Sequence, residues 1–461
     1  MTGAARVTAG AAGDGGRPAI ELAARDSYGR LLAYLAYRWR DIAAAEDALA
    51  EAFAAALVTW PRDGVPASPD AWLMTAARRN LLQAARHAKV AADPAVTILL
   101  GEEESASEEP PMIPDDRLKL LFVCAHPAID AGIHTALMLS TVLGLEAKQI
   151  AAAFLVKPAT LAQRLVRAKA KIRDAALRFE EPEAHDLPER VSAVLEAIYA
   201  AYGLGWDAAA DSQGADLAGE ALYLAQLVVK LLPADPPPKE AAGKPMEVLT
   251  DATREPAHAL ACNPAHAPAT QPSNQTARAE AAGLLALLLF CEARRPARET
   301  GGAFVPLHEQ DTTLWDLDLM GAANAALWQA AALKRPGRFQ LEAAIQSAHC
   351  QRAFTGTVPW QGIATLYAQL AALAPTIGAL VGQAVAVGEA QGPAAGLTLL
   401  AAMDDAAITD YQPWWVARGY LLAKQGERAE AYGCYQRAIG LTEQPATRDY
   451  LLRRAQALLD D

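Results

Sequence analysis

The stretch from Leu145 to Arg173 restricts the fold most, because it predicts two short helices separated by a turn. The first helix carries Ile150 and Ala151, and the turn is expected at residues 154–157. Pro158 follows, at a position where a first helical residue tolerates a missing N–H. The spacing therefore predicts a helix-turn-helix whose second helix begins at Pro158.

The second helix has one apolar and one polar face. Its apolar positions fall within a narrow arc at 100° per residue, and they are Leu161, Leu165, Ala168 and Ile172. The candidate DNA-binding side chains lie opposite them or just before the helix, and they are Lys157, Thr160, Gln163, Arg164, Arg167 and Lys171. Long basic side chains reach phosphates and base edges when a helix enters the major groove. The plain alternative is a surface helix with solvated charges.

Charge along the chain supports a local contact with a polyanion. Residues 147–178 carry a net charge of +7, whereas residues 1–146 carry −6 and residues 179–461 carry −13. A basic island in a chain of net charge −12 favours nucleic-acid binding at one place and discourages it elsewhere.

The whole chain is expected to be all-α and soluble. Alanine dominates, aromatic residues make up 6%, and runs that alternate at period two are nearly absent. A length of 461 residues allows two to four domains. The longest apolar run, residues 281–291, is too short to cross a bilayer. Five scattered cysteines are typical of reduced thiols, so we expect a cytoplasmic protein.

Residues 18–90 predict a helical unit with an acidic helix and a basic helix. The acidic helix begins after Asp41, and a loop is expected from Trp60 to Pro66. Its candidate partner-binding residues are Glu46, Asp47, Leu49, Glu51 and Phe53. In the basic helix, from Ala71 to Arg86, the candidate DNA-binding residues are Trp72, Arg78, Arg79, Asn80 and Arg86. An ordinary half-buried helix is the alternative for the acidic stretch, and a core position is the alternative for Trp72.

We expect the remaining segments to form a linker, a second domain and a long extension. Residues 1–17 are expected to form a disordered tail and residues 91–114 an acidic flexible linker. Residues 115–180 form the helix-turn-helix domain, and residues 181–461 an extension with a mobile insertion at 233–276. A tetratricopeptide-like repeat is expected at 412–445, with Trp415, Gly419, Leu422, Ala431, Tyr435 and Ala438 at its characteristic spacing. Gly392 and Gly426 stand one repeat of 34 residues apart.

This order of segments resembles the sigma-70 superfamily of the extracytoplasmic-function type. Residues 45–53 are similar to the region that grips core RNA polymerase. Residues 72–80 resemble the region that reads the −10 promoter element, and the helix-turn-helix resembles the domain that reads the −35 element. Residues 60–66, 113–117, 124–128, 153–156 and 162–169 resemble the subgroup with a large C-terminal tetratricopeptide-like extension. Further matches at 187–190, 310–316 and 340–345 carry the resemblance into that extension.

The resemblance implies a bacterial sigma factor rather than an enzyme. Its partners would be core RNA polymerase and promoter DNA, with no cofactor, metal or membrane, and its extension would regulate it in cis. A polymerase-independent helix-turn-helix regulator with a protein-interaction repeat is the competing hypothesis. A third hypothesis is a hidden enzyme, for which His308, Glu309, Asp311 and His349 are the noticeable candidates.

Overall fold

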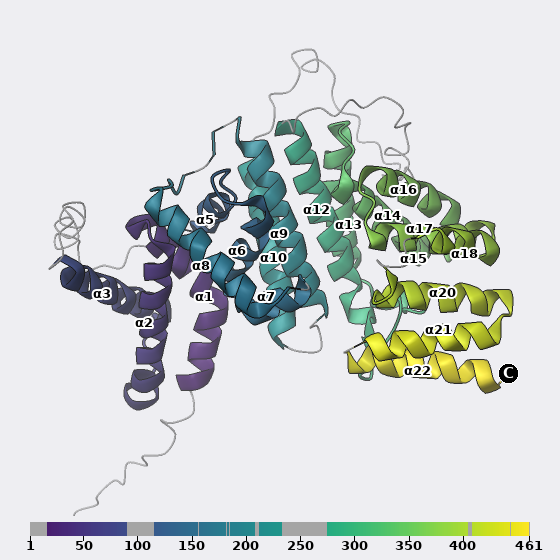
Figure 1. The fold of residues 1–461 in the computed structure, drawn as a ribbon, viewed down its shortest axis with the longest axis horizontal. Coiled ribbons are helices and arrows are strands. Elements are labelled where there is room, and N and C mark those ends of the chain that lie inside the picture. The colour runs from purple at the N-terminus through teal and green to yellow at the C-terminus, as the bar shows by residue number, and fades with distance from the viewer. Residues whose placement is uncertain are drawn as a thin grey trace, which may run out of the picture. The chain divides into compact units, whose positions relative to one another are not determined.

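A computed structural model describes most of the chain as α-helix, which confirms the expected all-α class. The described residues are 16–89, 115–154, 156–180, 182–183, 185–207, 212–232, 274–403, 408–442 and 444–460. The chain divides into two compact units, residues 1–224 and 225–461 (Figure 1). None of the described helices combines the length and apolar content that a bilayer span requires.

The first three helices of unit 1 pack on one another. They are α1 (Gly16–Trp39), α2 (Ile42–Asp63) and α3 (Pro69–Lys89). The Asp41 carboxylate caps α2 by accepting a hydrogen bond from the Ala44 N–H at 3.1 Å. The expected loop at Trp60 is wrong in its start, because α2 continues through Pro61 to Asp63. The helix ends at Gly64, whose φ of 92° favours glycine.

Six more helices follow among the described residues of this part of the chain. They are α5 (Arg117–Cys124), α6 (Ala131–Thr141), α7 (Ala147–Ala153), α8 (Pro158–Asp174), α9 (Leu187–Asp207) and α10 (Ser212–Leu231), and the division between the units falls within α10. Helix α6 packs against α7, α8 and α9, and α5 packs against α6 and α9. The first helix of the expected extension, α9, thus packs on the helices that precede it.

One buried arginine joins α5 to the start of α10. The Arg117 side chain is 8% exposed, and its guanidinium pairs with Asp115 at 2.7 Å and with Glu220 of α10. It also lies over the Tyr223 ring, 4.8 Å from the centroid, while the Tyr223 hydroxyl donates to Asp115 at 3.1 Å. The beginning of the extension therefore shares an ionic cluster with the domain before it.

Unit 2 consists mainly of sequential helices that pack against their neighbours. They are α12 (Asn274–Arg294), α13 (Leu317–Ala332), α14 (Arg338–Cys350), α15 (Arg352–Thr355), α16 (Trp360–Leu373), α17 (Ile377–Gln391), α18 (Pro393–Ala401), α20 (Gln412–Gln425), α21 (Arg428–Leu441) and α22 (Pro445–Asp460). Between α12 and α13 lie two short 3₁₀ turns, η1 (Arg295–Ala297) and η2 (Thr312–Leu314), and the antiparallel strands β1 (Glu299–Thr300) and β2 (Ala303–Phe304).

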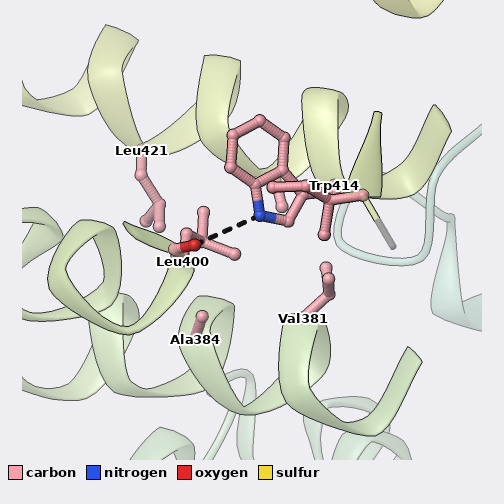
Figure 2. Packing of buried hydrophobic residues seen from close by; sticks show 7 residues of the cluster. Val381, Ala384, Leu400, Trp414 and Leu421 are labelled. Carbon is pink, nitrogen blue, oxygen red and sulfur yellow. Dashed lines mark hydrogen bonds between the residues drawn. The ribbon is translucent and has the colours of Figure 1, made fainter. Parts of the chain in front are cut away.

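The two glycines that stand 34 residues apart occupy equivalent turns. Gly392 joins α17 to α18 with φ 107°, and Gly426 joins α20 to α21 with φ 91°. Between these pairs lies an apolar cluster in which Val381, Ala384, Leu400, Trp414 and Leu421 meet (Figure 2). The indole N–H of Trp414 donates to the Leu400 carbonyl at 3.4 Å, so this buried polar group is satisfied.

Several expectations fall wholly or mostly outside the described residues. The acidic linker at 91–114 lies outside them, as do residues 1–15 of the expected tail and 233–273 of the expected insertion. The described ends of the tail and insertion are helical, since α1 begins at Gly16 and α12 begins at Asn274.

Candidate nucleic-acid interface

Helix α8 has the two faces that its sequence predicted. Leu161, Leu165, Ala168 and Ile172 are all buried against the rest of unit 1. The exposed candidates on or beside the helix are Lys157, Thr160, Gln163, Arg167 and Lys171. Each apolar residue that the 3.6-residue period placed inside is therefore inside, and a basic surface remains on the other side.

The turn before α8 also lies where it was expected. Helix α7 ends at Ala153, and Pro158 is the first residue of α8. At the start of α7 the Gln149 side chain accepts from the Glu146 N–H at 2.9 Å, and at its end the Val156 N–H donates to Ala151 O at 3.0 Å. The first of these hydrogen bonds caps the start of α7, and the second ends it, so that α8 begins after four residues.

A groove of about 510 Å³ lies between α8 and the start of α6. Its lining residues are Ile129, Asp130, Ile133, Thr160, Arg164, Arg167, Ala168 and Lys171. Four of them belong to the DNA-binding set expected from the sequence. The groove thus combines a cationic wall with an apolar floor and a single carboxylate.

Arg164 is engaged across this groove. Its Nη2 donates to the Gly132 carbonyl at 3.0 Å and lies 3.3 Å from Asp130 Oδ2. The Asp130 carboxylate also caps α6 by accepting from the Gly132 N–H at 3.1 Å. The Gly132 N–H first, and Arg164 second, hold the pKa of Asp130 below its usual value.

The acidic helix α2 divides its expected binding residues between surface and core. Asp47 and Glu51 are exposed, while Glu46 and Phe53 are partly buried. Leu49, the expected apolar anchor for a partner, is completely buried in this structure. Its side chain belongs to the core of unit 1 and stabilises the domain itself.

The exposed apolar side chains of α2 lie further along the helix. Leu57 and Val58 are both exposed, although they are large and hydrophobic. They follow Glu51 by two turns on a helix that also presents carboxylates. Four-residue periodicity groups Leu57 with Leu49 and cannot show where the covering helices end, so the sequence does not mark Leu57 and Val58 as exposed.

Glu46 is paired with α8, the helix that carries the basic surface. Lys169 Nζ donates to both carboxylate oxygens of Glu46 at 2.6 Å, and the two side chains are only 13% and 20% exposed. Near them, Arg173 Nη1 lies 3.9 Å from Asp41 Oδ2. Burial raises the pKa of the Glu46 carboxyl group and Lys169 lowers it. Burial is the larger effect, so the pKa lies above its usual value. In this arrangement the Glu46 carboxylate is occupied by a cation of the same chain.

The basic helix α3 likewise combines exposed and structural residues. Arg79 and Arg86 are exposed, and Arg78 is partly buried. Trp72 packs edge to face against buried Trp60, with ring centroids 5.6 Å apart and an interplanar angle of 73°. Asn80 is also engaged, because its side-chain N–H₂ donates to the carbonyl of Ala48 in α2 at 3.1 Å.

The four enzyme candidates of unit 2 each have partners close by. His308 Nε2 lies 3.3 Å from Glu309 Oε1, whereas Asp311 accepts from the N–H of Thr313 as the cap of η2. His349 packs against Trp360, and burial lowers its pKa to about 3. No group of three or more potential metal ligands occurs among the described residues. These side chains have local structural partners instead.

Comparison with known proteins bears on the first three helices directly. Residues 25–90, which include most of α1 and all of α2 and α3, match sigma-70 region 2. The chain belongs to the sigma-70 superfamily. Residues 190–243 and 251–331 match a family of unknown function, DUF6596, so this sigma factor carries a large C-terminal extension beyond its sigma region.

A relative extends over almost the whole sigma factor. Uncharacterized protein R00370 of Rhizobium meliloti (strain 1021) is 33% identical over 442 residues, which are 94% of this chain and 93% of that protein. No solved structure gives a significant match. The likeness therefore includes the extension as well as the sigma region.

Proposed function

We propose that the protein binds core RNA polymerase and directs transcription initiation from specific promoters. The match of α1 to α3 to sigma-70 region 2 carries this proposal. The exposed basic face of α8 supports it, because a second DNA contact at a fixed distance from the first would define a promoter.

On the proposed polymerase-binding surface, α2 provides charge and apolar area together. Asp47 and Glu51 are exposed and would meet basic groups of the polymerase, which steers association. Phe53, Leu57 and Val58 would supply the apolar contacts from which most binding free energy comes. This assignment replaces the buried Leu49 with residues that a partner can reach.

Promoter DNA would then contact two helices. On α3, Arg78, Arg79 and Arg86 would neutralise phosphates at the −10 element, where strand opening exposes bases. On α8, Lys157, Arg167 and Lys171 would hold the −35 duplex, with Thr160 and Gln163 near base edges. Trp72 and Asn80 would act mainly by fixing α3 against α2, since both side chains contact α2.

Use of Glu46 by polymerase would require a rearrangement within the sigma factor. Its carboxylate is held by Lys169 of α8, so a polymerase cation would have to replace that ammonium group. We therefore propose that core binding separates this part of α8 from α2.

We further propose that the extension regulates the sigma region in cis. The cluster formed by Arg117 and Glu220 links the sigma-type helices to the beginning of the extension. A test is to insert a specific protease site within residues 233–273 and to compare transcription before and after cleavage of the purified full chain. A changed transcript yield supports the regulation, and an unchanged yield refutes it.

Binding to core polymerase tests the main proposal. The full chain, labelled with a fluorophore, should bind purified bacterial core enzyme, and replacing Asp47 and Glu51 together with lysine should weaken binding at least tenfold. The matched control replaces Glu427 and Glu430 of unit 2 with lysine, which makes the same charge change. Equal binding by both variants would refute the assigned surface. Absence of any core binding would favour the polymerase-independent regulator.

A further inference from the structure

The groove beside α8 holds one carboxylate among its cations. Arg164 faces Asp130, whereas Arg167 and Lys171 have no acidic partner among the residues that the structure describes. Asp130 comes from the start of α6, 34 positions earlier in the chain, and its side chain is 74% exposed. A negative charge thus stands on the same surface that is proposed to face DNA.

Local structure holds this carboxylate in place. Asp130 is the N-cap of α6, and the Gly132 N–H fixes one of its oxygens at 3.1 Å. The Arg164 guanidinium lies over Gly132, where a Cβ would come within 3.2 Å of Nη2. A residue without a side chain therefore leaves room for the arginine to reach both the carbonyl and the carboxylate.

The consequence for DNA binding follows from electrostatics. Attraction to phosphates is the same for every sequence, and each neutralised phosphate adds to affinity without adding information. In the free protein the charge of Arg164 is already compensated by Asp130, and Asp130 itself repels a phosphate that enters the groove. Because both effects act on phosphates, they lower the affinity for every duplex by about the same factor.

Resting on the proposed promoter recognition, we propose that Asp130 withholds Arg164 from phosphates and so limits the affinity of the protein for DNA. Asp130 lowers the affinity for a cognate duplex and for an arbitrary duplex alike. The ratio of the two affinities therefore stays unchanged.

The decisive variant is Asp130→Asn, because asparagine caps a helix as well as aspartate does and removes only the charge. The full chain bound to core polymerase first enriches a duplex from random-sequence DNA. Affinities for that duplex and for a scrambled one are then measured with this complex, and the salt dependence on the scrambled duplex is measured with the full chain alone. Asp174→Asn is the matched control, since Asp174 is an exposed acid at the far end of α8 that pairs with Arg173.

Asp130→Asn has four expected outcomes. It should raise affinity for the scrambled duplex on the order of three- to tenfold at 50 mM salt, and steepen the log–log salt slope by about 0.9. The enriched duplex should gain by about the same factor, so the affinity ratio stays unchanged. In an Arg164→Gln background the gain should be smaller, because only the repulsion of phosphates by Asp130 is left to remove.

Three results would overturn this proposal. One is unchanged binding to the scrambled duplex, and another is an equal increase with Asp174→Asn, which would show a general charge effect. The third is a loss of affinity for the enriched duplex alone, which would mean that Asp130 only positions Arg164. Failure of the wild-type complex to enrich any sequence would instead refute the proposed function, and this inference with it.

Discussion

Replacing Lys169 with methionine should destabilise unit 1 at neutral pH. The variant keeps most of the apolar stem but leaves the Glu46 carboxylate, 20% exposed, without its cation. Breaking a fully buried pair costs about 3–5 kcal/mol, and exposed pairs contribute about 0.2–1 kcal/mol. The partial exposure of both side chains places the expected loss at roughly 2 kcal/mol.

The pH dependence of this loss has a definite sign. The pKa of Glu46 is raised in the folded protein, so its contribution is most favourable at low pH and is lost as pH rises through the folded pKa. Lys169 lowers this pKa, so removing Lys169 raises the pKa of Glu46 further. The destabilisation should therefore be larger at pH 7.5 than at pH 5, where more of Glu46 is protonated.

Hydrogen exchange of the full chain measures this loss of stability in the two helices that the ion pair joins. Peptides from α2 and α8 report the free energy of opening of unit 1, and peptides from α20 and α21 serve as an internal control. The double variant Glu46→Gln with Lys169→Met has no uncompensated charge and should recover to within about 1 kcal/mol of wild type. Wild-type protection in Lys169→Met at pH 7.5, or no recovery in the double variant, would show that the Lys169–Glu46 pair does not stabilise unit 1.

Three further substitutions test the packing of unit 2 and the ionic cluster of Arg117 and Glu220. Gly396→Ala should destabilise unit 2 by about 1–3 kcal/mol, because a Cβ there would clash with the backbone carbonyl oxygen of Ala384 and lie 2.8 Å from Leu421 Cδ1. Gly433→Ala, where a Cβ meets nothing within 4 Å, should instead stabilise its helix by about 0.5–1 kcal/mol, and exchange of α17 and α21 peptides checks both. Arg117→Met should increase exchange in α10, because it leaves Glu220 without its cation, at a cost of about 2–3 kcal/mol. Unchanged exchange in α10 would contradict this role of the cluster.

The sequence predicted most reliably what local rules determine. The 3.6-residue period placed Leu161, Leu165 and Ile172 in the core, and Pro158 marked the start of α8. The same period identified the face of α2 that carries Leu49, but it could not show that other helices cover this stretch of the face. The sequence prediction ended α2 too early, since Pro61 stands in the last turn of a helix that continues around it.

Contacts between distant residues could not be predicted from the sequence. Lys169 meets Glu46 across 123 positions, and Arg164 meets Asp130 across 34. Neither pair leaves a local pattern, because an acid and a base at such separations are common in any chain. The expected candidates therefore appeared as a uniform basic surface, whereas the structure divides them into engaged and exposed side chains.

Transcription in vitro is a direct test of promoter-specific initiation by this chain. The purified full chain is mixed with bacterial core RNA polymerase and with the duplex that their complex enriches from random-sequence DNA. We expect a discrete transcript that requires the chain and is lost when Arg167 and Lys171 are both replaced with alanine. Core enzyme that gives no discrete transcript with the wild-type chain, or a transcript that the double variant retains in full, would contradict the proposed function.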